Sequence, residues 1–327
     1  MFPDCGAGTV NGAMVGCASG MPMYTKSSNT GVNVEAEVNL DEQNLLRAGA
    51  LYQSYTLDDW WPPSGAMMWP GTFDNITYGT RDRLGLFGQR ESRINAQWLT
   101  LLGARYERVK TDAGNVRGYD QSTNGMGMMV NNQNNDAAAF NAQDRERNDN
   151  NWGLTGLARC TPDANSDLEF GIAPKVRSPN LYERYTWSMA AVMNNLVGDG
   201  NGYFGNINLK PEPAHTVSAT LDLYAANRRW EQLRVTPYYT RVTDYIDAIR
   251  CPVGASCALA NRTTTNQFIV LQYANQSAEL YGLDVSARMP RASSGFGDFG
   301  LVGVLSYTHG DNLYNIMPLN RKLALGG

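Results

Sequence analysis

The sequence has few of the groups that catalysis or nucleic-acid binding requires. Its 327 residues include only two histidines, His215 and His309, and no H-x-x-x-H motif, phosphate-binding loop, paired carboxylate site or nucleophile–base pair stands out. The net charge is −4 and no Lys- or Arg-rich run occurs, so there is no electrostatic basis for nucleic-acid binding. We therefore expect a protein that is not an enzyme and that does not bind nucleic acid.

Long apolar runs are also missing. No stretch approaches the roughly 18 apolar residues that a membrane helix needs, which excludes a helical membrane protein. The first residues, "MFPDCGAGTVNGAMVGC", have neither a basic start nor a continuous apolar segment, so we do not expect them to be a signal peptide. The lack of long apolar runs does not exclude a membrane β-barrel, because the strands of such a barrel carry only alternating apolar residues.

Alternation of apolar and polar residues is the dominant pattern. In "VNVEAEVNL" the even positions from Val32 to Leu40 are apolar, and in "TVSATLDLY" and "LYGLDVSAR" the odd positions are. No amphipathic helix competes with this pattern. It predicts eleven strands, at about 32–40, 45–55, 80–90, 96–107, 152–160, 166–173, 216–224, 231–250, 267–288, 299–308 and from 319 onward.

The connections between these strands alternate in length. Short ones fall at 41–44, 91–95, 161–165, 226–230 and 289–298. Long ones fall at 1–31, 56–79, 108–150, 174–215, 251–266 and 309–318. A soluble sandwich has no reason to sort its loops in this way, whereas an up-and-down barrel in an outer membrane has short periplasmic turns and long extracellular loops. Many Tyr and Trp residues lie in or beside the strands, as expected at a membrane–water boundary.

Several segments resemble the TonB-dependent outer-membrane receptors. "GNINLKPEPAHTVSATLDLY" (205–224) is similar to the N-x-x-L-K-P-E segment that leads into a barrel strand of that family. "VTPYYTRVTDYIDAI" and "YANQSAELYGLDVSARM" resemble its next hairpin. "RLGLFGQ", "WLTLLGARYERVKTDAGNVRGYD", "SPNLYERYTWSM" and "VGDGNGYFGN" resemble the copper-receptor branch. The resemblance covers residues 32–325.

The resemblance implies the fold and its surroundings. The family's barrels have about 22 strands around a lumen that an N-terminal plug closes. We expect an all-β chain, with residues 1–327 forming about half of such a transmembrane antiparallel up-and-down β-barrel and the plug absent. Because an open half-sheet would leave edge backbone groups unsatisfied in lipid, we expect a fragment of a longer receptor. Val217, Leu221, Tyr281 and Leu283 should then face lipid, and Asp222, Asp284 and Arg288 should face the lumen.

The resemblance also implies a role in the bacterial outer membrane. A receptor of this kind has outer-membrane lipid around it, takes its energy from the TonB complex through the plug, and needs no cofactor. Its cargo would be copper, a copper complex or another metal chelate. A ferric-siderophore receptor is the first alternative, and a passive pore or structural barrel is the second.

The methionines favour copper. Of the twelve besides Met1, eleven fall in the long connections, which hold about half of the chain, and Met289 falls in a short turn. Thioether sulfur is a soft ligand that selects Cu(I), and imidazole also suits copper. The candidate ligands are Met126, Met128 and Met129 in "NGMGMMVNNQNN", Met21 and Met23 in "GMPMY", and His215. The first of these segments is so rich in Asn that it predicts an exposed loop.

Other interpretations of these side chains stay open. The methionines could only anchor long loops, and His215 could only cap a strand end. Siderophore recognition would use Arg and aromatic side chains instead. Residues that could supply them are Arg177, Tyr182, Arg184, Tyr185 and Trp187.

The five cysteines fit neither a full disulfide framework nor a zinc site. Cys251 and Cys257 lie in one long connection, so an oxidising cell envelope would permit a local bridge. Cys5 and Cys17 could form a second bridge, and Cys160 is the odd one out.

Overall fold

The computed structural model describes residues 9–10, 13–14, 23–62, 72–118, 128–188, 201–224, 231–250 and 269–313. Ten long strands dominate these ranges: β3 (Tyr24–Asn39), β4 (Asn44–Trp61), β5 (Phe73–Arg93), β6 (Trp98–Asp112), β7 (Arg147–Asp163), β8 (Ser166–Arg177), β10 (Glu212–Tyr224), β11 (Glu231–Arg250), β12 (Val270–Ser294) and β13 (Gly297–Asn312). The smaller elements are β1 (Thr9–Val10), β2 (Ala13–Met14), β9 (Gly202–Phe204), α2 (Met128–Asn141) and α3 (Leu181–Tyr185).

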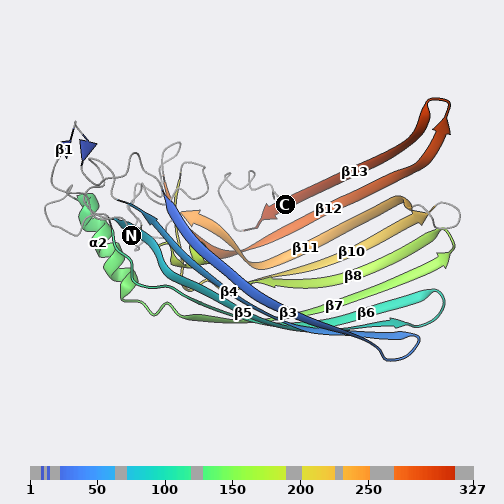
Figure 1. Ribbon diagram of the computed structural model, residues 1–327, viewed down its shortest axis with the longest axis horizontal. Helices are drawn as coiled ribbons and strands as arrows, with labels where there is room; N and C mark the ends of the chain where they lie inside the picture. Colours follow the sequence, from blue (N-terminus) through green and yellow to red (C-terminus); the bar gives the residue numbers. More distant parts are fainter. Residues whose placement is uncertain are drawn as a thin grey trace.

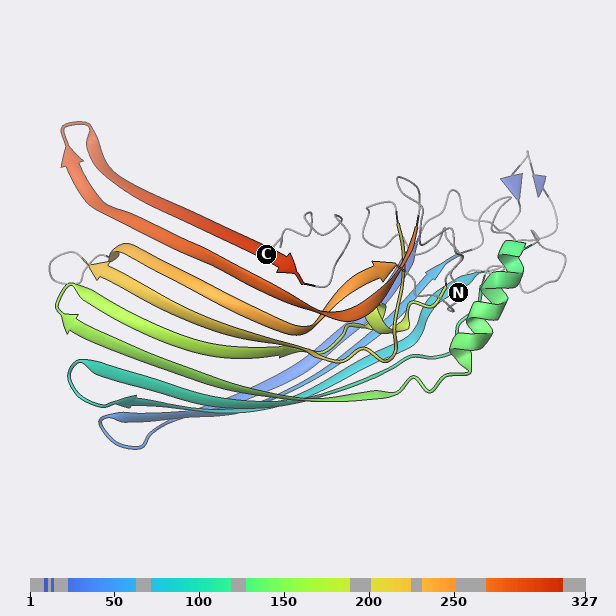
Figure 2. The ribbon, with the colours of Figure 1, turned by 180° about the vertical axis from the view of Figure 1, so that it is seen from behind.

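The long strands form one open sheet in the order β13-β12-β11-β10-β8-β7-β6-β5-β4-β3. Each long strand pairs antiparallel with the next long strand along the chain, and short β9 joins β12 in parallel. Figures 1 and 2 show the strands side by side in a long curved sheet. The predicted all-β, antiparallel up-and-down architecture is confirmed.

The two faces of the sheet carry different side chains. On one face, called the outer face, exposed apolar residues follow one another across the strands: Val34, Leu86, Leu102, Leu154, Ile172, Val217, Leu283 and Leu305. Val217 is 49% exposed and lies opposite Ile172 of β8. Asp222, on the opposite face of the same strand, is only 3% exposed. Such a sheet suits a protein with lipid on one side and a polar lumen on the other, as the alternation predicts.

Several strands are longer than the alternation predicts. β3 begins eight residues before the predicted start at Val32, and β5 begins seven residues before the predicted start at 80. These extensions lie at the end of the sheet with the long connections, which we call the loop end. Beyond the lipid no strict alternation is needed, because either face can be polar or packed against protein. The predicted strand from 319 lies outside the described residues.

One prediction about local structure is wrong. The Asn-rich segment 124–135 was expected to be a loop, but its residues from Met128 onward form the start of helix α2. Asn is a poor helix former, yet tertiary packing overrides propensity. Ala137 and Phe140, later in the same helix, are buried in a hydrophobic cluster that holds the helix against the loop end.

Candidate functional site

The helices α2 and α3, which belong to two of the long connections, lie at the loop end of the sheet (Figures 1 and 2). α3 is short but strongly defined at its start. The Asn180 side chain accepts a hydrogen bond from the backbone N–H of Glu183, and the Glu183 carboxylate accepts one from the backbone N–H of Asn180, at 2.8 Å each. This capping box satisfies two donors that the helix itself leaves unpaired. It explains why the sequence "NLYE" starts a helix here.

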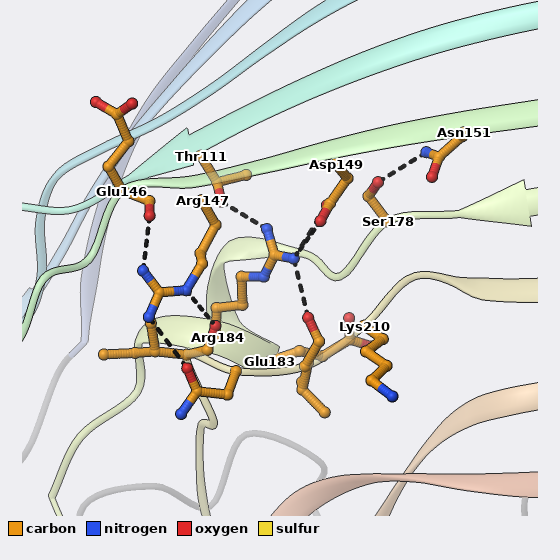
Figure 3. Close-up of polar contacts among 12 residues, drawn as sticks. Thr111, Glu146, Arg147, Asp149, Asn151, Ser178, Glu183, Arg184 and Lys210 are labelled. Atoms are coloured by element: carbon orange, nitrogen blue, oxygen red, sulfur yellow. Dashed lines mark hydrogen bonds and ion pairs between the residues drawn. The ribbon is translucent and has the colours of Figure 1, made fainter.

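Arg184 ties α3 to two strands of the sheet. Its side chain is 1% exposed and donates to Thr111 of β6 at 2.7 Å and to both carboxylate oxygens of Asp149 of β7 at 2.8 and 3.0 Å. It also donates to the carbonyl oxygen of Leu209 at 3.1 Å. Figure 3 shows the guanidinium of Arg184 between Thr111 and Asp149. Because three elements meet at one buried cation, Arg184 is structural.

An aromatic cluster packs beside α3. Phe73 stacks on Trp187 with 4.9 Å between ring centroids, and Trp61 meets Phe73 edge-on at 5.6 Å. The Trp187 indole N–H donates to the carbonyl oxygen of Asp74 at 2.9 Å. Tyr185 is fully buried, and its hydroxyl hydrogen-bonds Thr111 and donates to the carbonyl oxygen of Arg145. These contacts join β4 and β5 to the segment around α3.

Burial affects the acidity of the two tyrosines of α3. It raises the pKa of Tyr185 to about 12, although the hydrogen bond with Thr111 and the nearby Arg184 act in the opposite direction. Burial also raises the pKa of Tyr182 to about 12, with a further contribution from the negative charge of Asp59. Both phenols are therefore neutral at physiological pH and act through packing and hydrogen bonds.

The five residues proposed for siderophore recognition are already paired with other side chains or buried. Arg177 pairs with Glu183 at 2.9 Å and with Glu212 at 2.6 Å, and Arg184 pairs with Asp149. Tyr185 and Trp187 are buried, and Tyr182 packs against the same cluster. The siderophore interpretation therefore gains no free binding group from this set.

Three of the predicted copper ligands lie at the starts of two elements at the loop end. Met23 directly precedes β3 and is exposed at the loop end, while Met128 and Met129 form the start of α2. Met21 and Met126 lie outside the described residues. Met289, expected in a turn, lies within β12.

His215 lies away from Met23. It is exposed on β10, and β3 is separated from β10 by five strands in the sheet order. Its position two residues before Val217 places it on the outer face, because alternate residues of a strand share a face. In the part of the chain that the structure describes, no group of three or more His, Cys, Asp or Glu side chains could hold a metal ion.

Cys160 is a free thiol on β7. The proposed pairs Cys251–Cys257 and Cys5–Cys17 lie outside the described residues. None of the described helices is long and apolar enough to cross a membrane.

The inner face carries a group of charges that the sequence did not reveal. Arg83 of β5 and Arg105 of β6 both donate to the same carboxylate oxygen of Glu107, at 2.6 and 3.2 Å. These three side chains and Lys175 of β8 line one groove. Arg81 lies two residues from Arg83 on the same strand face. Alternation alone places each side chain on the inner face, but only the register shows that three strands bring them together.

Comparison with known proteins shows the family. A family model described as "TonB dependent receptor-like, beta-barrel" matches residues 8–324. Among curated protein sequences, none matches this chain significantly. The chain is similar to the solved structure "Copper transporter OprC", with a TM-score of 0.61, 15% identity, and coverage of 90% of this chain and 40% of that chain.

Two further solved structures show the same fold. The FrpB iron transporter from Neisseria meningitidis (F3-3 variant) has a TM-score of 0.54 and 13% identity, over 88% of this chain and 36% of that chain. The Serratia marcescens hemophore receptor HasR, in complex with its hemophore HasA and heme, has a TM-score of 0.51 and 16% identity, over 89% and 43%. The chain thus spans less than half the length of each.

The similar solved structures show the fold of this chain. The family model matches nearly the whole of its sequence. Exposed apolar residues on the outer face, charged residues on the inner face, and long connections at one end agree with an outer-membrane barrel. The chain belongs to the TonB-dependent receptor family of the bacterial outer membrane, and its sheet is part of that family's β-barrel.

Proposed function

We propose that this chain forms part of a receptor that imports copper or a copper complex across the outer membrane with energy from TonB. The observation that supports copper is the concentration of methionines in the long connections. Loops that carry thioethers on the extracellular side suit a soft cation such as Cu(I), because sulfur ligands select it over harder metals. The similarity to "Copper transporter OprC" agrees with this choice.

The proposed site is built from methionines of separate loops. Met23 precedes β3, and Met128 and Met129 begin α2, so the chain brings these three residues to the loop end. One thioether binds weakly, so a useful site needs about three soft ligands. We propose Met126, Met128 and Met129 as its centre, with Met21 and Met23 as further ligands.

The alternatives keep less support. Iron and heme appear in the names of FrpB and HasR, so another metal chelate is the second candidate. However, the Arg and aromatic side chains that would favour a siderophore are engaged in the structure around α3. A passive pore or structural barrel is disfavoured by membership of a receptor family.

The test uses the full-length receptor. Replacing Met126, Met128 and Met129 by Leu keeps size and apolarity but removes the sulfur. Cu(I) affinity, measured by competition with a chromophoric chelator, should fall by at least about tenfold, and Met289→Leu at the opposite end of the sheet should change nothing. Met21→Leu, Met23→Leu and His215→Ala test the remaining candidate ligands in the same assay.

Folding must be measured alongside binding. A folded β-barrel migrates differently from the heat-denatured chain on a gel, and the triple variant should keep the folded mobility. Unchanged Cu(I) affinity in a folded triple variant would contradict the proposal. The methionines would then only pack the loops, and the metal-chelate alternative would move ahead.

A further inference from the structure

The backbone pairing between the neighbouring strands β7 and β8 stops partway along both of them. Toward the loop end, the last paired residues are Gly156 and Ile172. Both strands continue beyond this point, β7 to Arg147 and β8 to Arg177. Over the same stretch β7 stays paired with β6, and β8 stays paired with β10. In their upper parts, β7 and β8 are therefore each paired on one side only.

A groove of about 340 Å³ lies where this pairing is lost. Its lining includes Trp152 and Gly153 of β7 and Pro174, Lys175 and Val176 of β8. Because consecutive residues of a strand point to opposite faces, this lining draws on both faces of the sheet. The groove therefore lies in the wall itself, between the two strands, and we call it the β7–β8 slot.

The local sequence explains why the strands separate here. Pro174 has no backbone N–H to donate, and Gly153 has no side chain to fill the space between the strands. Further toward the loop end a side-chain contact replaces the backbone pairing, since the Asn151 amide donates to the Ser178 hydroxyl at 2.9 Å. A Cβ on Gly153 would lie 3.3 Å from the carbonyl oxygen of Pro174. The β7–β8 slot can thus admit a small polar group, but it is too narrow for another strand.

The β7–β8 slot lies at the extracellular boundary of the membrane. Trp152 is 66% exposed on the outer face, and its ring centroid is 4.7 Å from that of Tyr106. Exposed Trp and Tyr side chains favour the level of the lipid headgroups. Leu154 and Ile172, beside the slot, are exposed on the outer face. Backbone groups that lose their strand partner next to lipid are costly, so a polar group is expected in the slot.

The charge that remains available at the slot is positive. Arg83 and Arg105 both donate to one carboxylate oxygen of Glu107, so these three side chains satisfy one another. Lys175 is exposed and forms no ion pair with any residue that the structure describes. A polar occupant of the slot should therefore carry a negative charge.

We infer that the β7–β8 slot binds the phosphate group of an anionic lipid from the outer leaflet. The phosphate oxygens accept hydrogen bonds from the Lys175 ammonium and from backbone N–H groups of the separated strands. The acyl chains of the same lipid lie against Leu154 and Ile172 on the outer face. The inference rests on the outer-membrane location of the family and stands whether or not the methionines bind copper.

The experiment titrates the full-length receptor in detergent with phosphatidylglycerol, phosphatidylcholine and inorganic phosphate, and counts bound molecules by native mass spectrometry. Phosphatidylglycerol should bind at least about tenfold more tightly than phosphatidylcholine, whose choline group is repelled by Lys175. Inorganic phosphate should bind more weakly still, because it has no acyl chains. Lys175→Gln should weaken phosphatidylglycerol binding by about tenfold or more. Lys110→Gln is the matched control, since that exposed ammonium pairs with Glu146 at 2.8 Å outside the slot, and it should have no effect.

Two further variants separate charge from shape. Lys175→Arg keeps the charge and should keep most of the affinity. Gly153→Val fills the slot and should abolish tight binding of phosphatidylglycerol in a barrel that keeps its folded mobility on a gel. The inference is overturned if the wild-type receptor binds phosphatidylcholine or inorganic phosphate as tightly as phosphatidylglycerol. It is also overturned if folded Lys175→Gln binds phosphatidylglycerol like the wild type, and water alone would then occupy the slot.

Discussion

Replacing Arg184 by methionine removes the buried cation that joins α3 to β6 and β7. The substitution keeps an unbranched apolar stem but deletes all the donors to Thr111, Asp149 and the Leu209 carbonyl. Asp149 is only 8% exposed, so its carboxylate would remain buried without a counter-charge. The perturbation acts at the loop end and leaves the lipid-facing strands intact.

The expected cost follows from the burial of both partners. Removing one member of a buried ion pair costs about 3–5 kcal/mol, chiefly because the other charge is left uncompensated. The double variant Arg184→Met/Asp149→Leu removes both charges and should recover more than half of that loss. Arg159→Met is the matched control. Its side chain is 41% exposed and pairs with Glu169, so its loss should cost no more than about 1 kcal/mol.

Hydrogen–deuterium exchange of residues 178–188, read by mass spectrometry, measures the opening of this region. A loss of about 3 kcal/mol raises the open population roughly a hundredfold. Exchange in the lipid-facing strands should stay as in the wild type. If Arg184→Met exchanges within about fivefold of the wild type, or the double variant opens as readily as the single one, the structural role assigned to Arg184 is wrong.

Three further predictions concern the two faces of the sheet, a close contact at a glycine, and Tyr185. Leu154→Arg places a charge on the lipid-facing surface and should lower the free energy of unfolding by about 2–4 kcal/mol near the membrane midplane. Thr155→Arg, on the inner face, should lower it far less, and denaturant titration in lipid vesicles measures both. Gly282→Ala should reduce refolding yield, because a Cβ there collides with a β13 carbonyl oxygen, whereas Gly303→Ala meets nothing within 4 Å and should refold normally. The raised pKa of Tyr185 contributes stability that is fully present below pH 10, the ordinary tyrosine value, and is lost as the pH rises to about 12. Tyr185→Phe should therefore flatten the pH dependence of the free energy of unfolding between pH 10 and about 12. An equally steep loss of stability in the variant would show that other groups cause it.

The strands could be predicted from the sequence wherever lipid dictates the pattern. Val32 to Leu40 and Val217 to Leu223 alternate because one face meets hydrocarbon and the other meets polar surroundings. At the loop end that constraint disappears. The start of β3 from Tyr24 and the start of β5 from Phe73 were therefore missed.

The helix α2 was missed for a different reason. Its first half is rich in Asn, and local propensity disfavours a helix there. Its position depends on Ala137 and Phe140, which pack against residues distant in the chain. The start of α3, by contrast, had a readable signal, because Asn180 and Glu183 have the spacing of a capping box.

The charged groove could be predicted only in part. Arg81 and Arg83 share a face by simple alternation, and so do Arg105 and Glu107. That Arg83, Arg105 and Glu107 line one groove with Lys175 depends on the register of β5 through β8, which one sequence does not determine. The pairing of Arg184 with Asp149 joins residues 35 positions apart and depends on the same tertiary arrangement.

The proposal of copper capture is tested most directly by X-ray absorption at the copper edge of the full-length receptor loaded with Cu(I). The account predicts sulfur atoms in the first coordination shell, and their loss when Met126, Met128 and Met129 are replaced by Leu in a barrel that remains folded. A first shell of nitrogen and oxygen alone, unchanged by the substitutions, would contradict it.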